Sequence, residues 1–423
     1  MKKTLIILIS LFVIMGCATK PVSKQNENGI VRFRDAKPEI LASLQVPPSL
    51  SPLQVPYPED LQRHFQPVTL SMFGDGISHA RFGTEGGSLG YDIYAETQIA
   101  GIAENILFAQ NNDGGWGKNI DYAKMISEKN MADPIYRGGY RLESTLDNNN
   151  IYTQIQYLSL VYKIIPDPRY AQSMIRAFDW IVKNQNKDSG GFRGADVDAV
   201  TFNDNVMIGV LNICSAIFTD TDRYSFFTDE QRVQAKDVYD KALACILKCQ
   251  VKVPQADGTM LLTAWGQQHD HKTFEPVWAR NYEPPSITAS ESVGVIRALM
   301  SIENPSDEIK TSIIAACEWL NRDDIKIWGY DLVRVPIERQ KIGARYYDFD
   351  QRLVENKDAE PLWARFYDPV TMKPLWYDRG KKLCAEYNDI SLERRNGYRY
   401  VYTWPKNLLK TEYPEWKAKN NIK

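Results

Sequence analysis

The sequence predicts an all-α fold, an (α/α)₃ toroid of helical-hairpin repeats that carries its functional loops at one rim. The first observation is a recurring unit in which a helix end is followed by a loop with an aromatic residue. The second is that apolar residues recur at i, i+3, i+4 and i+7 in a further segment of each unit. The third is that 43% of the residues are hydrophobic, which is enough for a large core.

The repeats define the expected helices. Helix ends are predicted at 103–110, 179–185, 244–250 and 316–320. The aromatic residues that follow them are Trp116, Phe192, Trp265 and Trp328. Second helices are predicted at 148–165, 203–218 and 290–303. A single hairpin cannot bury its apolar face, so we expect the hairpins to close into a ring.

The N-terminus has the pattern of a secretion signal. Two lysines precede an apolar run at Leu5–Met15, which is too short for a permanent membrane-spanning helix. The run leads to Cys17 in a sequence that resembles a bacterial lipobox. We therefore expect residues 1–16 to be a signal peptide and residues 17–68 to be a proline-rich tether that begins with a lipidated cysteine. Residues 69–423 are expected to form the functional domain.

These features predict the location of the protein. A lipid on Cys17 anchors it in the cell envelope, and the absence of an acidic residue directly after this cysteine favours the outer membrane, on its periplasmic or its outer face. We expect a monomer. The other five cysteines have no zinc or redox spacing, so we expect buried thiols. The 51 basic and 53 acidic residues nearly cancel, which excludes nucleic-acid binding through bulk positive charge.

The second helices begin near acidic residues. If the repeats are equivalent, Asp147, Asp204 and Glu291 lie at the same end of the ring as the aromatic loops and Lys118. The alternative is that each acidic or amide side chain only caps a helix. Three such positions beside Gly-Gly-aromatic loops favour a site that binds an anionic ligand.

Several stretches, in this order and spacing, resemble polysaccharide lyase family ten, the pectate lyases. The similarity runs from about Gly90 to Trp404, and its motifs are Asn111–Asn119, Ser144–Asn148, Thr201–Asp204, Leu262–Asp270, Pro276–Pro285, Ser290–Gly294, Pro361–Tyr367 and Glu393–Tyr398. There are departures: Gly117 replaces a usual proline, and Asn149 stands where a glycine is expected. The segment 193–198 also differs from many relatives.

The resemblance implies an (α/α)₃ toroid and calcium-assisted anti-β-elimination on polygalacturonate or pectin. It places Arg280 at the catalytic base and Asp147 at an essential acidic position near the metal. Asp147 and Asp204 are the expected calcium ligands. The residues expected to contact substrate are Lys118, Asn119, Trp116, Asn148, Tyr282, Arg365 and Arg395.

The residue types suit this chemistry. Elimination removes the proton on C5 of a uronide, which builds negative charge next to a carboxylate, so the site must neutralise charge there. Calcium prefers oxygen ligands, and arginine binds carboxylates with two parallel hydrogen bonds. The Trp-Ala-Arg-x-Tyr pattern occurs twice, so the sequence offers both Arg280 and Arg365 as the base. We favour Arg280, which precedes the third rim helix.

Two other classes of function remain open from the sequence. One is a glycoside hydrolase on a uronide-rich polysaccharide, with paired carboxylates such as Asp147 and Asp204. The other is a surface glycan-binding lipoprotein without catalysis. A transition-metal site at His269 and His271 is a further alternative, but a third ligand at suitable spacing is missing.

Overall fold

The computed structural model describes residues 70–81, 91–96, 98–125, 143–342 and 345–422. The predicted signal peptide, the lipidation site Cys17 and the tether lie outside the described residues. Within the described part, no helix has the length and the apolar character needed to cross a membrane.

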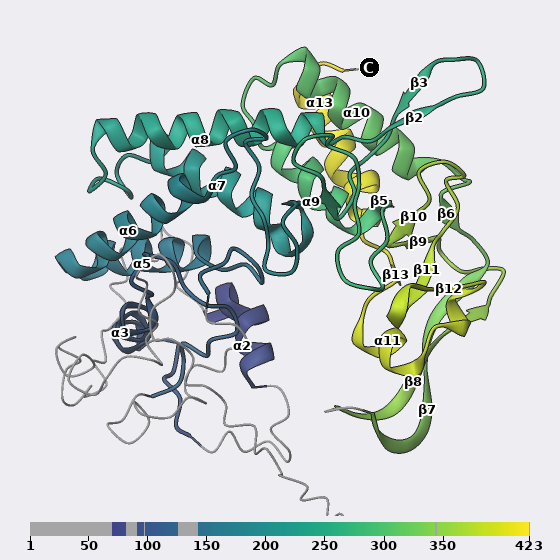
Figure 1. Ribbon diagram of the computed structural model, residues 1–423, viewed down its shortest axis with the longest axis horizontal. Helices are drawn as coiled ribbons and strands as arrows, with labels where there is room; N and C mark the ends of the chain where they lie inside the picture. Colours follow the sequence, from purple (N-terminus) through teal and green to yellow (C-terminus); the bar gives the residue numbers. More distant parts are fainter. Residues whose placement is uncertain (1–69, 82–90, 97, 126–142, 343–344, 423) are drawn as a thin grey trace, which may run out of the picture.

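Helices form the left and upper parts of the molecule (Figure 1). The long helices are α3 (Ile99–Ala109), α5 (Tyr152–Ile164), α6 (Pro168–Asn184), α7 (Val206–Thr219), α8 (Asp229–Lys248), α9 (Ala289–Met300) and α10 (Asp307–Asn321). The short ones are α2 (Gly74–Ala80), α11 (Leu392–Gly397), α12 (Pro405–Asn407) and α13 (Tyr413–Lys419). Helix α5 packs on α6, α7 on α8, and α9 on α10, so the predicted helical hairpins form.

The outer helices of these pairs have the local signals of a helix start. Asp167 caps α6 and is followed by a proline, Thr228 and Gln231 form a capping box at α8, and Ser306 caps α10. By contrast, no side chain caps α5, α7 or α9. Asp147 and Asp204, which precede α5 and α7, and Glu291, in the first turn of α9, therefore do not cap these helices.

The expectation of an all-α toroid is wrong, because small antiparallel sheets fill the right side of the molecule (Figure 1). The strands are β1 (Val200–Thr201), β2 (Lys252–Pro254), β3 (Met260–Leu262), β4 (Gln268–His269), β5 (Ile287–Thr288), β6 (Lys326–Ile327), β7 (Tyr330–Ile342), β8 (Arg345–Glu355), β9 (Leu362–Ala364), β10 (Phe366–Tyr367), β11 (Trp376–Asp378), β12 (Lys382–Cys384) and β13 (Val401–Tyr402). The pairs are β1–β4, β2–β3, β5–β10, β7–β8 and β11–β12, and β9 lies between β6 and β13. Most of these strands have two or three residues, which is too short for an alternating hydrophobic pattern to reveal them.

The fourth repeat differs from the expected one. The indole Nε1 atoms of Trp116, Trp265 and Trp363 each donate a hydrogen bond to a carbonyl near the end of the preceding long helix, at Ile106, Ile246 and Leu320. Trp363 is thus the fourth repeat aromatic, whereas Trp328 is 49% exposed. The β7–β8 hairpin separates α10 from Trp363 and so hides the true spacing.

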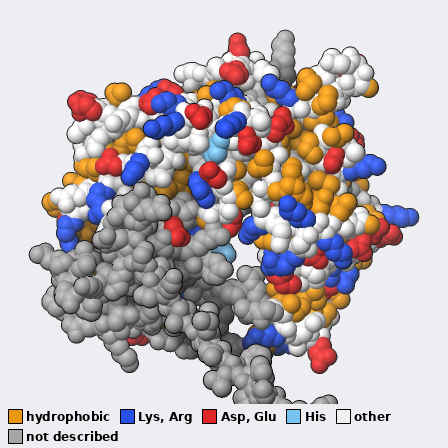
Figure 2. All heavy atoms as spheres, viewed as in Figure 1, with side chains coloured by type: hydrophobic (Ala, Val, Ile, Leu, Met, Phe, Trp, Pro, Cys, Tyr) orange, Lys and Arg blue, Asp and Glu red, His pale blue; other side chains and the backbone are white. Residues whose placement is uncertain are grey.

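The exposed surface also reflects this hairpin. Figure 2 shows hydrophobic side chains gathered on the strand-rich right side of the molecule. Several large exposed hydrophobic residues belong to these strands and their flanks: Trp328, Tyr330, Val335, Tyr346, Val354 and Tyr402. The free edge of β8 is covered by the side-chain amides of Asn388 and Asn396, which bond to its backbone at Phe349, Gln351 and Leu353.

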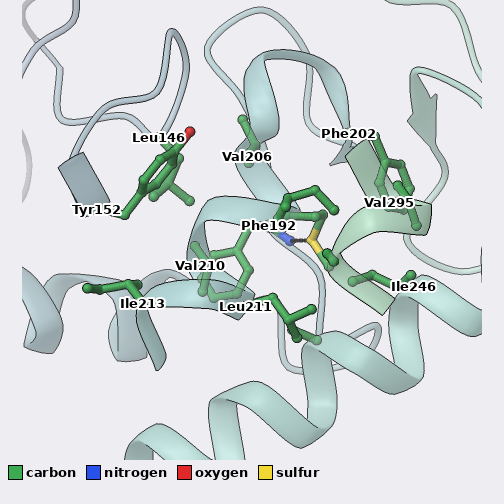
Figure 3. Close-up of a cluster of buried hydrophobic side chains, with 14 of the residues drawn as sticks. Leu146, Tyr152, Phe192, Phe202, Val206, Val210, Leu211, Ile213, Ile246 and Val295 are labelled. Atoms are coloured by element: carbon green, nitrogen blue, oxygen red, sulfur yellow. Dashed lines mark hydrogen bonds between the residues drawn. The ribbon is translucent and has the colours of Figure 1, made fainter. Parts of the chain in front are cut away.

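The inner helix α7 lies at the centre of the core. In Figure 3 its residues Val206, Val210 and Ile213 lie among side chains contributed by other segments, such as Tyr152 of α5 and Val295 of α9. The close contact of α5 and α7 depends on Gly209, where a Cβ would lie 2.1 Å from the Tyr152 ring.

The ends of the inner helices that carry the acidic residues, here called the rim, are aligned by backbone hydrogen bonds from the loops. The N–H groups of Thr145, Thr201 and Thr288 donate to the carbonyls of Trp116, Phe192 and Trp265. Asp147 lies two residues after the first threonine, Asp204 three after the second, and Glu291 three after the third. The repeats therefore bring these acidic residues to one end of the inner helices, as the repeat pattern predicts.

Candidate active site

The loop after α3 supplies the first cation of the site. Gly114 has φ 99°, and a Cβ there would lie 2.3 Å from the carbonyl oxygen of Arg176, so only glycine fits. Trp116 is fully buried and anchors the loop through its bond to Ile106, which places it in the core and away from substrate. Lys118 follows and forms an ion pair with Asp147.

Asp147 and Asp204 meet at the rim, and a hydrogen bond joins their carboxyl groups. Burial raises the pKa of Asp147, but the hydrogen bond from Asp204 and the charge of Lys118 outweigh it and the pKa is lowered. For Asp204, loss of water and the charge of Asp147 hold the pKa well above its usual range. Two carboxylates this close share a proton until a further cation is present.

Left-handed backbone shapes this rim. Asn119, Asn148, Asn149 and Asp204 have φ of 66°, 54°, 57° and 52°. Asparagine and aspartate adopt this conformation more readily than other non-glycine residues, so Asn149 meets the backbone requirement where a glycine was expected. The Asn148 Nδ2 donates to Asn119 Oδ1 over 2.6 Å, which pairs these two predicted substrate contacts with each other.

Arg280 lies close enough to the carboxylate pair for its charge to favour the ionised form of both members, although burial and the charge of Asp147 still keep the pKa of Asp204 raised. Its Nε donates to Glu283 Oε2 over 2.9 Å, its backbone N–H donates to the same oxygen over 3.0 Å, and its Nη2 bonds to Oε1. Burial lowers the pKa of Arg280, yet Glu283 raises it more, so the pKa is raised. The Arg280 side chain is 37% exposed and therefore reaches the rim surface.

Arg365 and Tyr398 lie behind Arg280. Arg365 forms an ion pair with Glu291 and its side chain is only 12% exposed. The guanidinium carbons of Arg280 and Arg365 lie 5.6 and 4.5 Å from the centre of the Tyr398 ring. The Tyr398 hydroxyl donates to Glu283 Oε1 over 2.9 Å. Tyr398 therefore contacts both cations and joins them to the same network.

The other two predicted contacts are less accessible. Tyr282 is 4% exposed and lies against the guanidinium groups of Arg280, Arg379 and Arg394. Arg395 is 4% exposed and binds Asp350 of β8 through Nε and Nη2, at 3.0 and 2.8 Å. The structure brings Lys118, Asp147, Asp204 and Arg280 together, but it directs Arg395 to the hairpin.

A cleft of about 620 Å³ opens beside Asp147. It is lined by Glu143, Ser144, Thr145, Leu146, Trp180, Asn184, Phe192, Arg193, Gly194 and Ala195. A Cβ at Gly194 would lie 3.5 Å from Asp147 Oδ1, so this lining residue of the cleft packs against the buried carboxylate. Asp196, which follows the lining residue Ala195 in the chain, has its Oδ2 4.0 Å from Arg280 Nε.

The histidines do not form a metal site. His269 is fully buried, with Nδ1 2.8 Å from the carbonyl of Phe274 and Nε2 2.9 Å from the N–H of Gly266. Burial lowers its pKa to about 4, so it is a neutral structural residue. His271 lies 2.8 Å from the Ser189 hydroxyl. Among the residues that the structure describes, no three acidic, histidine or cysteine side chains gather as a metal site.

The carboxylate pair nevertheless fits a calcium ion with few protein ligands. Both donors are oxygens, which calcium prefers, and burial together with the charge of Asp147 holds the pKa of Asp204 above its usual range, an effect that a bound cation would oppose. The five cysteines at 214, 245, 249, 317 and 384 are buried free thiols, as expected.

Comparison with known proteins identifies the class of protein to which the chain is similar. Two solved structures of a family 10 polysaccharide lyase from Cellvibrio cellulosa are each 26% identical to the chain. One is a mutant in complex with trigalacturonic acid, with a TM-score of 0.62 over 81% of this chain and 96% of that chain. The other has a TM-score of 0.61 over 82% and 97%. A search of curated proteins finds no significant match.

The family follows from the sequence match. The pectic acid lyase family matches residues 110–409, so the chain belongs to that family and is a polysaccharide lyase. The resemblance noted in the sequence is thereby confirmed.

Sequence reasoning missed three members of the site. Glu283, Asn203 and Tyr398 lie within the matching motifs, but none of them was expected to be a site residue. The signal for Asn203 was its position next to Asp204. No local pattern indicates Tyr398, because its partners lie more than 30 residues away in the chain.

Proposed function

We propose that the protein is a pectate lyase that cleaves α-1,4-polygalacturonate by calcium-assisted anti-β-elimination and releases unsaturated oligogalacturonides. The observation that supports this most directly is Arg280, a partly exposed cation whose charge acts on both members of the Asp147–Asp204 pair. The trigalacturonic acid bound to the Cellvibrio relative supports a polygalacturonate substrate.

In this proposal Arg280 removes the C5 proton. The electrons of the C5–H bond form a C4–C5 double bond, the C4–O4 bond breaks, and the leaving oxygen takes a proton from water. A calcium ion held by Asp147 and Asp204 would neutralise charge that develops on the uronide carboxylate. Lys118 holds Asp147 in place through their ion pair.

Arg280 must release its own proton before it accepts one from C5. Glu283 opposes this release, because its carboxylate raises the pKa of the guanidinium. A bound cation at the neighbouring carboxylates would favour the neutral guanidine by repulsion. The reaction should therefore become faster toward alkaline pH.

The glycosidase alternative is less compatible with the geometry. Glycosidases place the sugar between two carboxyl groups about 5–9.5 Å apart. Asp147 and Asp204 are hydrogen-bonded to each other, which leaves no room for a sugar ring between them.

The decisive assay measures the ultraviolet absorbance of unsaturated uronide ends with polygalacturonate as substrate. We expect product that carries this absorbance, loss of activity on exhaustive chelation, and recovery with calcium better than with magnesium. Reducing ends without the absorbance would indicate a hydrolase, and binding without product would indicate a glycan-binding protein. Full activity after chelation would contradict the calcium role but not the elimination reaction.

We further propose that Cys17 carries the lipid anchor and that the monomeric enzyme resides at the outer membrane. The support is the lipobox-like sequence that ends at this cysteine. Cys17→Ser should release the protein from the membrane fraction or leave it unprocessed, as fractionation and mass measurement would show. An unchanged mature mass and membrane fraction would contradict the anchor.

A further inference from the structure

We propose that Arg365 is a positioning residue that orients the Asp204 carboxylate through Asn203, rather than a ligand of a flanking uronate. The inference rests on the proposed function, in which Asp204 is a calcium ligand. Four residues from three segments form the chain of contacts: Glu291, Arg365, Asn203 and Asp204.

The backbone of Arg365 is fixed on both sides. Its N–H donates to the carbonyl of Tyr400 over 2.6 Å, and its carbonyl accepts from the N–H of Ala289, the first residue of α9, over 3.1 Å. It follows Trp363, the anchored aromatic residue of the fourth repeat. The start of the side chain is therefore held in register with the rim.

The guanidinium is fixed as well. Glu291, in the first turn of α9, accepts from Nη2, and its side chain is 4% exposed. The guanidinium carbon lies 4.5 Å from the centre of the Tyr398 ring. An arginine that is held by a buried carboxylate and an aromatic face has little freedom to follow a mobile polymer.

Arg365 then decides which way the Asn203 amide faces. Its Nη2 donates to Asn203 Oδ1 over 3.0 Å. A guanidinium has donors only, so the amide oxygen must face Arg365. The amide nitrogen consequently faces Asp204 and donates to Oδ2 over 3.0 Å. Without Arg365 the amide can turn over and present its oxygen to the carboxylate, which is repulsive.

The carbonyl of Asp204 is held separately. Asp204 lies in the short turn Asn203–Asn205 with φ 52°, and its carbonyl accepts from the Tyr152 hydroxyl over 3.1 Å. The two anchors together leave the carboxylate of Asp204 aimed at Asp147.

The first repeat contains a matching arrangement. Lys118 lies two residues after Trp116, as Arg365 lies two residues after Trp363, and Lys118 binds Asp147 directly. The two cations thus occupy the same position in their repeats. One holds its carboxylate by contact, and the other acts through an amide.

A double-mutant cycle tests the chain of contacts from Arg365 through Asn203 to Asp204. Arg365→Lys, Asn203→Ala and the double variant are made in a protein that also carries Arg280→Lys, so that bound trigalacturonate is turned over slowly. Calcium is titrated calorimetrically in the presence of trigalacturonate. We expect each single variant to weaken calcium binding about tenfold or more, and the double variant to be no weaker than the more severe single one. Arg297→Lys, in a surface ion pair with Glu412, is the control and should change nothing.

Two outcomes would overturn the proposal. One is unchanged calcium affinity together with weaker trigalacturonate binding at saturating calcium, which would make Arg365 a uronate ligand. The other is additive loss in the double variant. If the Arg280→Lys parent binds no calcium, the calcium part of the proposed function fails instead. In that case the same double-mutant cycle is measured as the unfolding midpoint of protein that keeps Arg280. Non-additive effects of Arg365→Lys and Asn203→Ala would support the chain of contacts, and additive effects would contradict it.

Discussion

The carboxylate of Glu283 accepts three hydrogen bonds from Arg280: from Nε over 2.9 Å, from the backbone N–H over 3.0 Å, and from Nη2. Glu283 is 1% exposed, whereas Arg280 reaches the surface of the rim. The pair therefore fixes the direction of the proposed base and at the same time keeps it protonated.

Replacing Arg280 tests its assignment as the base. Arg280→Lys keeps the charge but loses the planar fork and the direction that Glu283 imposes. We expect kcat to fall at least about a hundredfold, with KM changed much less. Steady-state kinetics on polygalacturonate measure both constants. Arg297→Lys is the control, because Arg297 pairs with Glu412 in the same bidentate way outside the site. A change confined to KM would contradict the assignment.

Removing the charge of Glu283 should move the pH dependence. Glu283→Gln abolishes the ion pair, so the pKa of Arg280 falls and the rising limb of kcat should move to lower pH by about one unit or more. The plateau should be lower, because the glutamine positions the guanidine less well. The measurement is kcat against pH for both proteins. Glu412→Gln removes the partner of Arg297 and should leave the limb in place. A stationary limb in Glu283→Gln would mean that another group limits the rate.

His269 should make the fold sensitive to acid. Its pKa is about 4 in the folded state, because it is buried, against about 6.5 in an unfolded chain. Between these values only the unfolded state binds the proton, so the free energy of unfolding falls as the pH drops from about 6.5 to 4, by about 3 kcal/mol in total.

The test is denaturant unfolding across this pH range. His269→Gln should make the free energy of unfolding depend less steeply on pH. It also destabilises the protein at neutral pH, because it breaks the hydrogen bonds to Gly266 and Phe274. His79→Gln, at an exposed histidine on α2, should not reduce the slope of this pH dependence. An unchanged slope in His269→Gln would assign the acid sensitivity to other groups.

The packing of α5 on α7 should tolerate no side chain at Gly209. A Cβ there would lie 2.1 Å from the Tyr152 ring, and this tyrosine also holds the carbonyl of Asp204. Gly209→Ala should lower the free energy of unfolding by about 1–3 kcal/mol and should also reduce activity. Thermal unfolding and the lyase assay check the two effects. Gly74→Ala, where a Cβ meets nothing within 4 Å, is the control and should be nearly neutral. A stable, active Gly209→Ala variant would show that Tyr152 can move aside without affecting the rim.

The helical repeats were predictable because their signal is local. Apolar periodicity located α5, α7 and α9 to within a few residues, since burial of one helix face imposes that pattern on consecutive residues. Asp147, Asp204 and Lys118 followed from their equivalent places in the repeats. The helix-capping alternative was wrong for α5, α7 and α9, where no side chain caps the helix.

The sheets and the fourth repeat were not predictable in this way. Strands of two or three residues carry no periodicity, and β1, β5 and β9 exist because each pairs with a segment distant in sequence. The long β7–β8 hairpin displaced Trp363 from the expected interval, so Trp328 took its place in the pattern. Spacing along the chain does not reveal an insertion that folds on itself.

By itself, the sequence determined the helical hairpins, the acidic rim and the membership of the pectic acid lyase family, because repeats and motifs are patterns of neighbouring residues. Only the tertiary structure decided what each charged side chain faces. Arg280 and Arg365 have the same sequence pattern, yet the partly exposed Arg280 binds Glu283, whereas the more deeply buried Arg365 binds Glu291 and Asn203. The direction of a long side chain depends on the buried partners that reach it from other segments, and no local pattern encodes those partners.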